Sequence, residues 1–384
     1  MDNDQGLTTI SPEPAGRLDE QRKAALETAR TFVPLRSMRP NFLSELFARV
    51  VVEELAPGQE LFHQGEHDQQ VIYLLHGLLR LERDNAVSFV DAATTNTPIA
   101  NKQPRPLTAV AETACGVLRI DADELDRLLC WSQVADYLLA EIGSRRELDE
   151  DVTWMQTILS SNLFFKVPPV NVENIFSRLE AQLVRTGETI VRQGELGDCC
   201  YFIKEGSAQV VLRDEKTQQI NKLVNLFPGR CFGEDALVND APRNASVTML
   251  SDGVLMRLHK QDFELLLKEP ISDEISEEEI EKLLDVPIYL DSRTEEEYRL
   301  GHISFSGNMP LGLLGIKKRL LSQEKLYLFY CDTGRRSRAA AYLLGKLGYN
   351  TMMLKGGLNA AIDDDILVSE PGYILRGGEL AAVE

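Results

Sequence analysis

The stretch TGETIVRQGELGDCCYFIKEG, residues 186–206, resembles an earlier stretch of the same chain, PGQELFHQGEHDQQVIYLLHG at residues 57–77. Glycines and a Gln-Gly-Glu triplet recur in both at a constant offset of 129 residues, as in Gly77 and Gly206. Between the glycine turns, apolar and polar residues alternate, which is typical of short antiparallel strands that bury one face. The repeat therefore predicts two related β-rich domains.

The two copies differ in one segment. The offset rises from 129 to 138 residues at Arg105 and Arg243, so the first copy is nine residues shorter before its arginine. The second copy has CFGEDALVNDAPRNASV there, at residues 231–247. In it Gly233 allows a tight turn, and EDALV can form one helical turn whose free N–H groups face an anion. Arg243 adds a permanently charged, forked donor that suits a phosphodiester.

Residues 231–247 resemble the phosphate-binding cassette of cyclic nucleotide-binding domains, approximately F-G-E-x-A-L, a short spacer and P-R-x-A-[ST]-V. The resemblance implies that Glu234 binds the ribose 2′-hydroxyl and that Arg243 binds the cyclic phosphate. The ligand-binding residues that it implies are Phe232, Gly233, Glu234, Ala236, Leu237, Arg243, Asn244 and Ala245.

The resemblance also indicates the regulatory ligand. We expect cAMP rather than cGMP, because bacterial members of this family commonly use cAMP, although the residues themselves fit either nucleotide. The first copy lacks the F-G-E segment, so we expect a degenerate domain that binds no nucleotide. The alternative for the second copy is a cassette kept only as a structural relic.

Residues 121–161, between the two copies, place apolar side chains at helical spacing. In this family such helices carry dimer contacts, and one interpretation is a homodimer formed through them. The other is that the apolar stripe packs on its own barrel. The sequence leaves both open.

A third domain follows the acidic link ISDEISEEEIEKLL, which comes directly after Pro270 and in which Ser276 and Glu279 have capping-box spacing. Beyond the link, the apolar runs VPIYLD and LYLFYC alternate with the helix-like segments EEEYRLG and RAAAYLLGKLG. This alternation predicts a parallel sheet, whose ligand sites lie at the carboxyl ends of its strands. Cys331 falls at such an end.

The stretch CDTGRRS, residues 331–337, resembles the active-site loop of the rhodanese family, and IYLDSRTEEEYRLGHI and LKGGL resemble further elements of that family. The resemblance covers residues 276 to about 361. It departs from the family in one place, because a Trp common after the double glycine is absent and Ala361 lies near its place.

The rhodanese resemblance implies a sulfurtransferase that carries sulfur as a persulfide on Cys331. Amides of the loop and the positive end of the following helix are expected to lower the thiol pKa and to hold the sulfur anion. Arg336, helped by Arg335, would attract an anionic donor such as thiosulfate or a persulfide. The expected catalytic residues are Cys331, Arg336, Asp332, Thr333, Gly334, Arg335 and Ser337, with Asp291 and Arg293 as framework partners.

A phosphatase is the enzymatic alternative for this loop. Related folds hold phosphate with a cysteine and an arginine six positions later. Here the sixth position is Ser337 and the arginine, Arg336, is at the fifth. The shorter loop favours sulfur over the larger phosphoryl group.

Charge and composition limit the class of partner. The net charge of −19 argues against nucleic acid and anionic membranes. The N-terminus lacks the features of a signal peptide, and no apolar run approaches the roughly 18 residues of a membrane span, so we expect a cytoplasmic protein. The six cysteines show no regular framework and indicate reduced thiols. Without a CxxC motif or His/Cys cluster, we expect no metal site.

These patterns together predict a multidomain α+β and α/β chain, with two β-jelly-roll (double-stranded β-helix) cyclic nucleotide-binding domains and a rhodanese-like α/β domain with a parallel sheet. The expected boundaries are 1–30 for an N-terminal segment, 31–150 for the degenerate domain with its connecting helix, 151–272 for the nucleotide-binding domain, and 273–384 for the rhodanese-like domain with its tail. The expected function is sulfur transfer regulated by a cyclic nucleotide. The alternative is a signalling adaptor whose rhodanese module binds a partner with little turnover.

Overall fold

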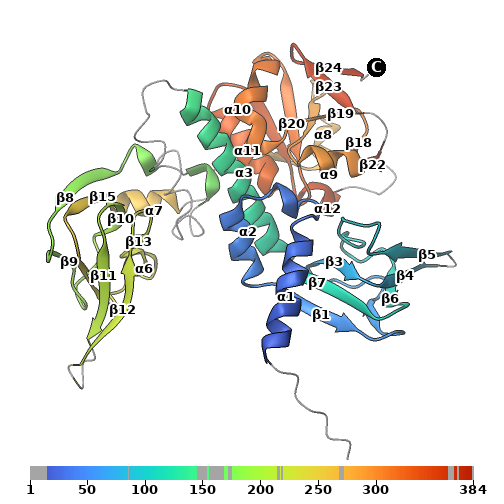
Figure 1. Cartoon of the computed structure of the whole chain (residues 1–384). Helices are drawn as coiled ribbons and strands as arrows, with labels where there is room; N and C mark the ends of the chain where they lie inside the picture. The colour runs from blue at the N-terminus through green and yellow to red at the C-terminus, as the bar shows by residue number, and fades with distance from the viewer. Residues whose placement is uncertain are drawn as a thin grey trace, which may run out of the picture. The chain divides into compact units, whose positions relative to one another are not determined.

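The computed structural model describes residues 15–84, 86–144, 154, 168–171, 175–213, 217, 219–267, 272–361, 367–369 and 372–382. The chain divides into two compact units. One comprises residues 1–38 and 43–125, and the other comprises residues 39–42 and 126–384. Figure 1 shows the helices and strands of each unit.

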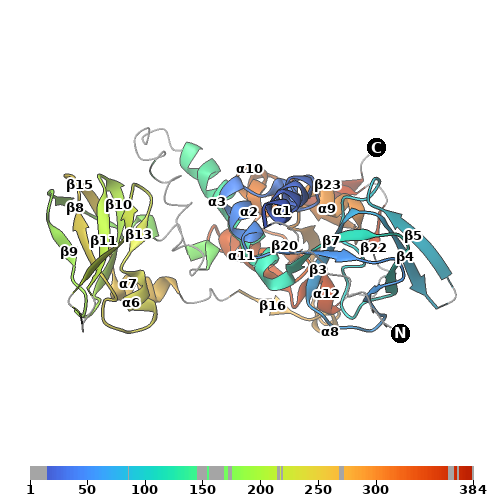
Figure 2. The same ribbon diagram turned by 60° about the horizontal axis from the view of Figure 1, so that its bottom comes forward.

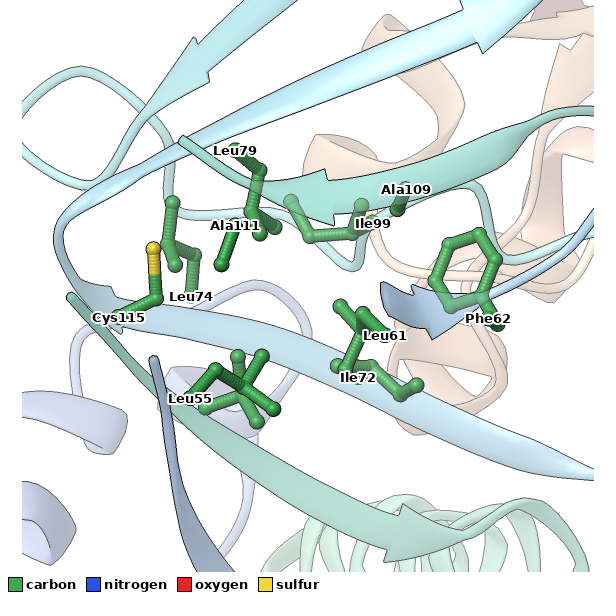
Figure 3. Close-up of a cluster of buried hydrophobic side chains, with 11 residues drawn as sticks. Leu55, Leu61, Phe62, Ile72, Leu74, Leu79, Ile99, Ala109, Ala111 and Cys115 are labelled. Atoms are coloured by element: carbon green, nitrogen blue, oxygen red, sulfur yellow. The ribbon is translucent and has the colours of Figure 1, made fainter. Parts of the chain in front are cut away.

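The first unit contains a sandwich of two antiparallel sheets, here called the first sandwich (residues 51–121). Its strand orders are β1-β7-β3 and β2-β6-β4-β5. The strands are β1 Val51–Leu55, β2 Glu60–Phe62, β3 Gln70–His76, β4 Leu78–Arg83, β5 Ala86–Asp91, β6 Thr108–Ala111 and β7 Cys115–Asp121. Alternate side chains of both sheets form one buried apolar core, which Figure 3 shows around Leu55, Ile72 and Leu79. The period-two pattern of the sequence is therefore confirmed.

Three helices accompany the first sandwich in sequence: α1 Ala15–Ala29, α2 Pro40–Phe47 and α3 Ala122–Ser144. Helix α3 confirms the helical spacing after β7, and its apolar residues such as Leu128, Val134 and Leu138 are buried within the chain. The continuation of that pattern through residues 145–161 lies outside the described residues, apart from Trp154. The homodimer expected through this stripe stays a prediction. None of the described helices is long and apolar enough to cross a membrane.

The second unit contains a sandwich of the same kind, here called the second sandwich (residues 180–259). Its strand orders are β13-β10-β15-β8 and β12-β11-β14-β9. The elements are β8 Glu180–Val184, β9 Thr189–Val191, β10 Cys199–Glu205, β11 Ala208–Arg213, β12 Ile220–Leu226, β13 Cys231–Phe232, α6 Glu234–Val238, β14 Ser246–Met249, β15 Gly253–His259 and α7 Lys260–Leu266. The segment missing from the first copy forms β13 and α6. Figure 2 shows α6 and α7 side by side at one end of this sandwich.

The C-terminal part of the chain forms an α/β domain around a sheet of order β16-β21-β20-β17-β19-β23-β24. Neighbouring strands run parallel from β16 to β23, and only β24 is antiparallel to its neighbour. The elements are β16 Glu274–Ile275, α8 Glu277–Ile280, β17 Ile288–Asp291, α9 Glu295–Leu300, β18 His302–Ile303, β19 Ser306–Asn308, α10 Leu314–Lys317, β20 Leu326–Tyr330, α11 Arg335–Gly345, β21 Asn350–Leu354, α12 Gly357–Ala361, β22 Leu367–Val368, β23 Tyr373–Arg376 and β24 Glu379–Ala382. The predicted parallel sheet is confirmed.

The start of this domain and its central strand also follow the sequence patterns. The Ser276 amide donates to Oε2 of Glu279 at 2.9 Å, as the capping-box spacing predicts for α8. Strand β20 lies between β17 and β21, and its residues 327–330 are fully buried. Pro270, which comes directly before the acidic link, lies outside the described residues. The sheet therefore delivers Cys331 from a buried strand, at its carboxyl end.

One buried ion pair joins α9 to α11. Arg336 donates from Nη1 and Nη2 to the two carboxylate oxygens of Glu297, at 2.9 Å each. Both side chains are buried. Burial alone would raise the pKa of Glu297, but the charge and hydrogen bonds of Arg336 outweigh it and hold the pKa at about 2. The pair therefore stabilises the domain as long as Glu297 is ionised.

We expect Glu297→Gln to destabilise the C-terminal domain by about 3–5 kcal/mol at neutral pH, because it leaves a buried guanidinium without its main partner. The folded pKa lies below the ordinary value of 4.5, so the contribution of the pair is complete above about pH 4.5 and is lost as the pH falls toward 2. The difference in the free energy of unfolding between variant and wild type should shrink as the pH falls over that range. Hydrogen exchange of the β20 and α11 amides measures it.

The matched control is Glu295→Gln on the same helix, whose exposed pair with Arg299 at 2.6 Å should contribute less than about 1 kcal/mol. Equal exchange rates in the two variants would contradict the assignment of stability to the buried pair.

Candidate functional site

The segment that only the second sandwich has folds around the Arg243 side chain. Gly233, which precedes α6, has a φ of 86°, and a Cβ atom there would lie 2.6 Å from Nη1 of Arg243. Only glycine therefore fits. Arg243 donates from Nη1 to the Gly233 carbonyl at 2.5 Å and from Nη2 to the Cys199 carbonyl at 2.6 Å. The guanidinium is buried and fixed beside α6.

The other predicted residues of this segment divide into packing and lining positions. Phe232 and Leu237 are buried, and the Phe232 ring stacks on Tyr201 at 5.3 Å, so these side chains belong to the core. Three more predicted residues are also buried, namely Glu234, Ala236 and Ala245. Asn244 is exposed. The structure thus brings Gly233, Glu234 and Arg243 together, as the motif predicts.

Gly197, which the sequence analysis did not single out, lies against this segment. A Cβ atom there would approach Cβ of Ala236 to 2.9 Å and Cζ of Arg243 to 3.2 Å. In the first copy, at the offset of 129 residues, the corresponding residue is Asp68. A comparison of the aligned copies could have found this exchange.

Asp68 binds the arginine of the first sandwich. Arg105 is 1% exposed and donates from Nη2 to both carboxylate oxygens of Asp68, at 2.8 Å each. Its guanidinium also bonds the Gln70 and Ala100 carbonyls and lies 4.4 Å from the Phe62 ring centroid. Burial alone would raise the pKa of Asp68, but the bonds from Arg105 and neighbouring groups lower it below its usual range. The first sandwich therefore satisfies its arginine with its own carboxylate.

The first sandwich also lacks a counterpart of α6. Between β5 and β6 the described residues 92–107 form turns and bends without a helix. The segment that would carry a glutamate beside the arginine is absent from the chain itself. The expectation of a degenerate first copy rests on both features.

The loop of residues 331–337, here called the Cys331 loop, follows β20. Cys331 Sγ accepts a hydrogen bond from the Gly334 amide at 3.2 Å and lies 3.6 Å from Oγ of Ser337. Gly334 has a φ of 94°, and this left-handed conformation bends the chain back over the sulfur. The Cys331 side chain is fully buried. The loop therefore surrounds one sulfur atom with polar groups.

A second glycine holds this loop from the other side. A Cβ atom on Gly357 would lie 2.2 Å from the Cys331 carbonyl oxygen and 2.7 Å from the Gly334 nitrogen. The Leu358 amide donates to that same Cys331 carbonyl at 2.8 Å. The second glycine of LKGGL, Gly357, is therefore required by contact with the loop.

Charged side chains fill the space around the Cys331 loop. Asp332 accepts from Arg293 at 3.0 Å and from Arg336 at 2.9 Å. Arg293 in turn pairs with the buried Asp291 at 2.8 Å. Arg336 faces inward, toward Glu297 and Asp332, and the side chain of Arg335 is 37% exposed. The predicted residues and their framework partners therefore form one connected network.

Asp126 of helix α3 also reaches this network. Its Oδ2 accepts a hydrogen bond from Oγ1 of Thr333, 207 residues later in the chain. The same carboxylate lies 3.4 Å from Nε of Arg335 and 3.6 Å from Nε of Arg336. No signal in the sequence connects Asp126 with the loop, so sequence analysis could not have found it.

The surroundings of Cys331 change its acidity in the direction opposite to expectation. The sequence analysis expected a lowered pKa, but burial raises the pKa of the Cys331 thiol and the Asp126 carboxylate raises it further. Arg336 and the Ser337 amide oppose this only in part. All six cysteines are free and buried. Among the described residues, no group of His, Cys, Asp or Glu is arranged to hold a metal ion.

Comparison with known families assigns all three folded regions. Residues 52–130 and residues 181–269 both match the cyclic nucleotide-binding domain family. Residues 276–363 match the rhodanese-like domain family. The matches follow the first sandwich, the second sandwich and the C-terminal domain.

Individual relatives match parts of the chain. The cAMP-dependent protein kinase type II regulatory subunit of Drosophila melanogaster is 26% identical over 64% of this chain and 61% of its own length. A cyclic nucleotide-gated potassium channel of Mesorhizobium japonicum is 36% identical over 32% of each chain. The chain thus spans about three fifths and one third of these relatives.

A solved structure, the regulatory domain of Toxoplasma gondii PKA with cAMP, aligns at 19% identity with a TM-score of 0.25, over 65% of this chain and 93% of its own. The family matches include the segments in which the sequence motifs lie. The protein therefore consists of two cyclic nucleotide-binding domains followed by a rhodanese-like domain.

Proposed function

We propose that the second sandwich binds one cyclic nucleotide per chain and that Cys331 carries sulfur in a transfer reaction under the control of that nucleotide. The observation that carries the enzymatic part is the position of Cys331 Sγ. It accepts the Gly334 amide at 3.2 Å, inside a loop that Gly334 and Gly357 hold in place. A merely structural cysteine would need neither glycine.

The chemistry requires the thiolate of Cys331. After its proton leaves to solvent, the thiolate attacks the outer sulfur of thiosulfate, a new S–S bond forms, and sulfite departs with the electron pair of the broken S–S bond. A nucleophile such as cyanide then takes the outer sulfur, and Cys331 leaves as thiolate. The Gly334 amide and the N-terminal end of α11 stabilise both sulfur anions.

The nucleotide part rests on Arg243. Its guanidinium is held beside α6 by two backbone carbonyls, and a cyclic phosphate would supply a stronger, charged acceptor than either. The Drosophila relative is named as a cAMP-dependent regulatory subunit, which supports cAMP as the ligand to test first, with cGMP beside it.

A signalling adaptor is the second candidate, and one observation favours it. The Cys331 side chain is fully buried and its pKa is raised by burial, so the thiolate is disfavoured in this arrangement. In an adaptor the C-terminal domain would bind a partner without turnover.

The compartment belongs to the proposal as well. Six free cysteines fit a reducing compartment such as the cytoplasm. A persulfide carrier also needs its thiol reduced between turnovers. The net charge of −19 favours small anions held in local basic pockets over nucleic acid as ligands.

We expect calorimetric titration of cAMP onto the full chain to give one site, because only the second sandwich has a cassette. Arg243→Ala should weaken binding by about 2–5 kcal/mol, since it leaves the phosphate without its charged partner. The control is Arg257→Ala. Arg257 lies on β15 and pairs with Glu180 at 2.6 Å, so its loss should leave the affinity for cAMP unchanged. Two sites per chain, or normal affinity in Arg243→Ala, would refute the assignment.

Gly197→Asp should abolish nucleotide binding by reproducing in the second sandwich the Asp68–Arg105 pair of the first. Gly197→Asn has the same shape without the charge and separates the steric effect from ion pairing. We expect the Asp variant to bind at least about tenfold more weakly than the Asn variant, a difference of about 1.4 kcal/mol. Equal affinities would show that space alone matters. The reverse exchange, Asp68→Gly, should leave one site per chain.

Cys331→Ser should reduce thiosulfate-to-cyanide transfer to the uncatalysed rate, because serine cannot carry a sulfane sulfur. The control is Cys115→Ser. Cys115 is buried and its thiol donates to the Leu78 carbonyl, a hydrogen bond that the serine hydroxyl can keep. Thiocyanate formation and the added mass of one sulfur atom on the intact protein measure the result. Turnover in Cys331→Ser, or none in the wild type with any donor, removes the enzymatic proposal and leaves the adaptor.

The same sulfur-transfer assay with and without cAMP tests whether the nucleotide regulates the reaction. Coupling between two sites typically changes affinities by about 5- to 150-fold. Since that coupling is reciprocal for binding, persulfidation of Cys331 should change cAMP affinity too. No change in either quantity would mean two independent functions on one chain.

A further inference from the structure

We infer that the Asp126 carboxylate occupies the anion position of the Cys331 loop, so that helix α3 is an internal competitor of the anionic sulfur donor. The inference rests on the proposed sulfur transfer and adds a residue from outside the rhodanese-like domain to that site. Asp126 and the loop belong to the same compact unit of the chain.

Three donors of one loop converge on this carboxylate. Thr333 donates its hydroxyl hydrogen to Oδ2, and Nε of Arg335 lies 3.4 Å from the same oxygen. Nε of Arg336 lies 3.6 Å from Oδ1. A hydroxyl and two guanidinium groups around one pair of oxygens can bind a small oxyanion. The oxygens of thiosulfate are anionic hydrogen-bond acceptors like those of a carboxylate.

The Nε atom of Arg336 donates no hydrogen bond to any described residue. The Nη1 and Nη2 atoms of the same side chain are bonded to Glu297 and Asp332, whereas the buried Nε has no hydrogen-bond partner among the described residues. Nε is turned toward Asp126, at a distance longer than a hydrogen bond. An oxyanion in place of the carboxylate could move close enough to accept from it.

Burial shows that the contact closes the site. Asp126 is 6% exposed and Cys331 is fully buried. A carboxylate is removed from water at a cost of several kcal/mol unless cations pair with it, so the loop arginines hold Asp126 in place. The donor must reach the same buried sulfur, and therefore helix and donor exclude each other.

Further contacts hold α3 against the C-terminal domain. Glu141, four turns beyond Asp126, pairs with Lys318 at 2.7 Å. A Cβ atom on Gly312 would lie 3.4 Å from Cβ of Asp136, and one on Gly315 would lie 2.8 Å from Oε1 of Glu141. Gly315 therefore leaves room for the end of the Glu141 side chain, whereas a Cβ atom on Gly312 would make only an ordinary van der Waals contact with the helix.

Reactivity of Cys331 in the full-length protein tests the inference without turnover. Iodoacetate carries a carboxylate and iodoacetamide does not, and peptide mass spectrometry separates Cys331 from the other cysteines. Asp126→Asn removes the charge and keeps the shape. We expect it to raise the rate of Cys331 modification by iodoacetate about 5- to 150-fold, and the rate by iodoacetamide by less.

Two further variants separate charge from helix detachment. Glu141→Gln breaks the distant pair with Lys318 and should accelerate both reagents equally, because it loosens the helix without changing the anion position. Asp136 also lies on α3, and it pairs with Arg39 at 3.2 Å. Asp136→Asn breaks that pair and should change neither rate. Unchanged iodoacetate rates in both Asp126→Asn and Glu141→Gln would overturn the inference.

Sulfur transfer distinguishes this inference from the proposed function. If both are right, Asp126→Asn lowers the KM for thiosulfate. If Asp126→Asn gains iodoacetate reactivity but neither it nor the wild type transfers sulfur, the competitor is supported and the proposed function fails. If the wild type transfers sulfur and Asp126→Asn has the same KM and the same iodoacetate rate, the function stands and the competitor is refuted.

Discussion

The buried guanidinium of Arg336 is the interaction on which the C-terminal domain depends. It faces three carboxylates, Glu297 on α9, Asp332 in the Cys331 loop and Asp126 on α3. A buried cation is tolerated only when anions accompany it, so each of these carboxylates can leave Arg336 only if another anion takes its place. The same charges set the conditions at Cys331, because Arg336 favours the thiolate while Asp126 and burial disfavour it.

The two sandwiches show how one residue decides the use of the same arginine. Arg105 and Arg243 precede the equivalent strands β6 and β14, and both are buried. In the first sandwich Asp68 accepts three hydrogen bonds from the guanidinium. In the second, the glycine at that position leaves Arg243 bonded to two neutral carbonyls, with the exposed Asp198 carboxylate 3.7 Å away, and a charged phosphate can replace these carbonyls. The duplicated fold thus holds one arginine paired with its own carboxylate and one hydrogen-bonded to backbone carbonyls.

Much of this architecture could be predicted from local sequence. The alternating strands of both sandwiches, the parallel sheet and the cysteine at the end of β20 follow from periodicities of a few residues. Gly233 and Gly334 were predicted because their left-handed backbone angles exclude other residues, and such a constraint belongs to the residue itself. Gly357 was found only through its motif, since the atoms that require a glycine there come from the Cys331 loop.

By itself, the sequence determined the three domains, the cassette around Arg243 and the loop around Cys331, because each is built from residues close together in the chain. Only the tertiary structure decided the environment of those groups. Asp126 meets Thr333 across 207 residues, and the pKa of Cys331 is raised rather than lowered. The physical reason is that burial and charge act through space: desolvation depends on every segment packed around an atom, and no pattern of neighbouring residues encodes which distant helix will supply a carboxylate.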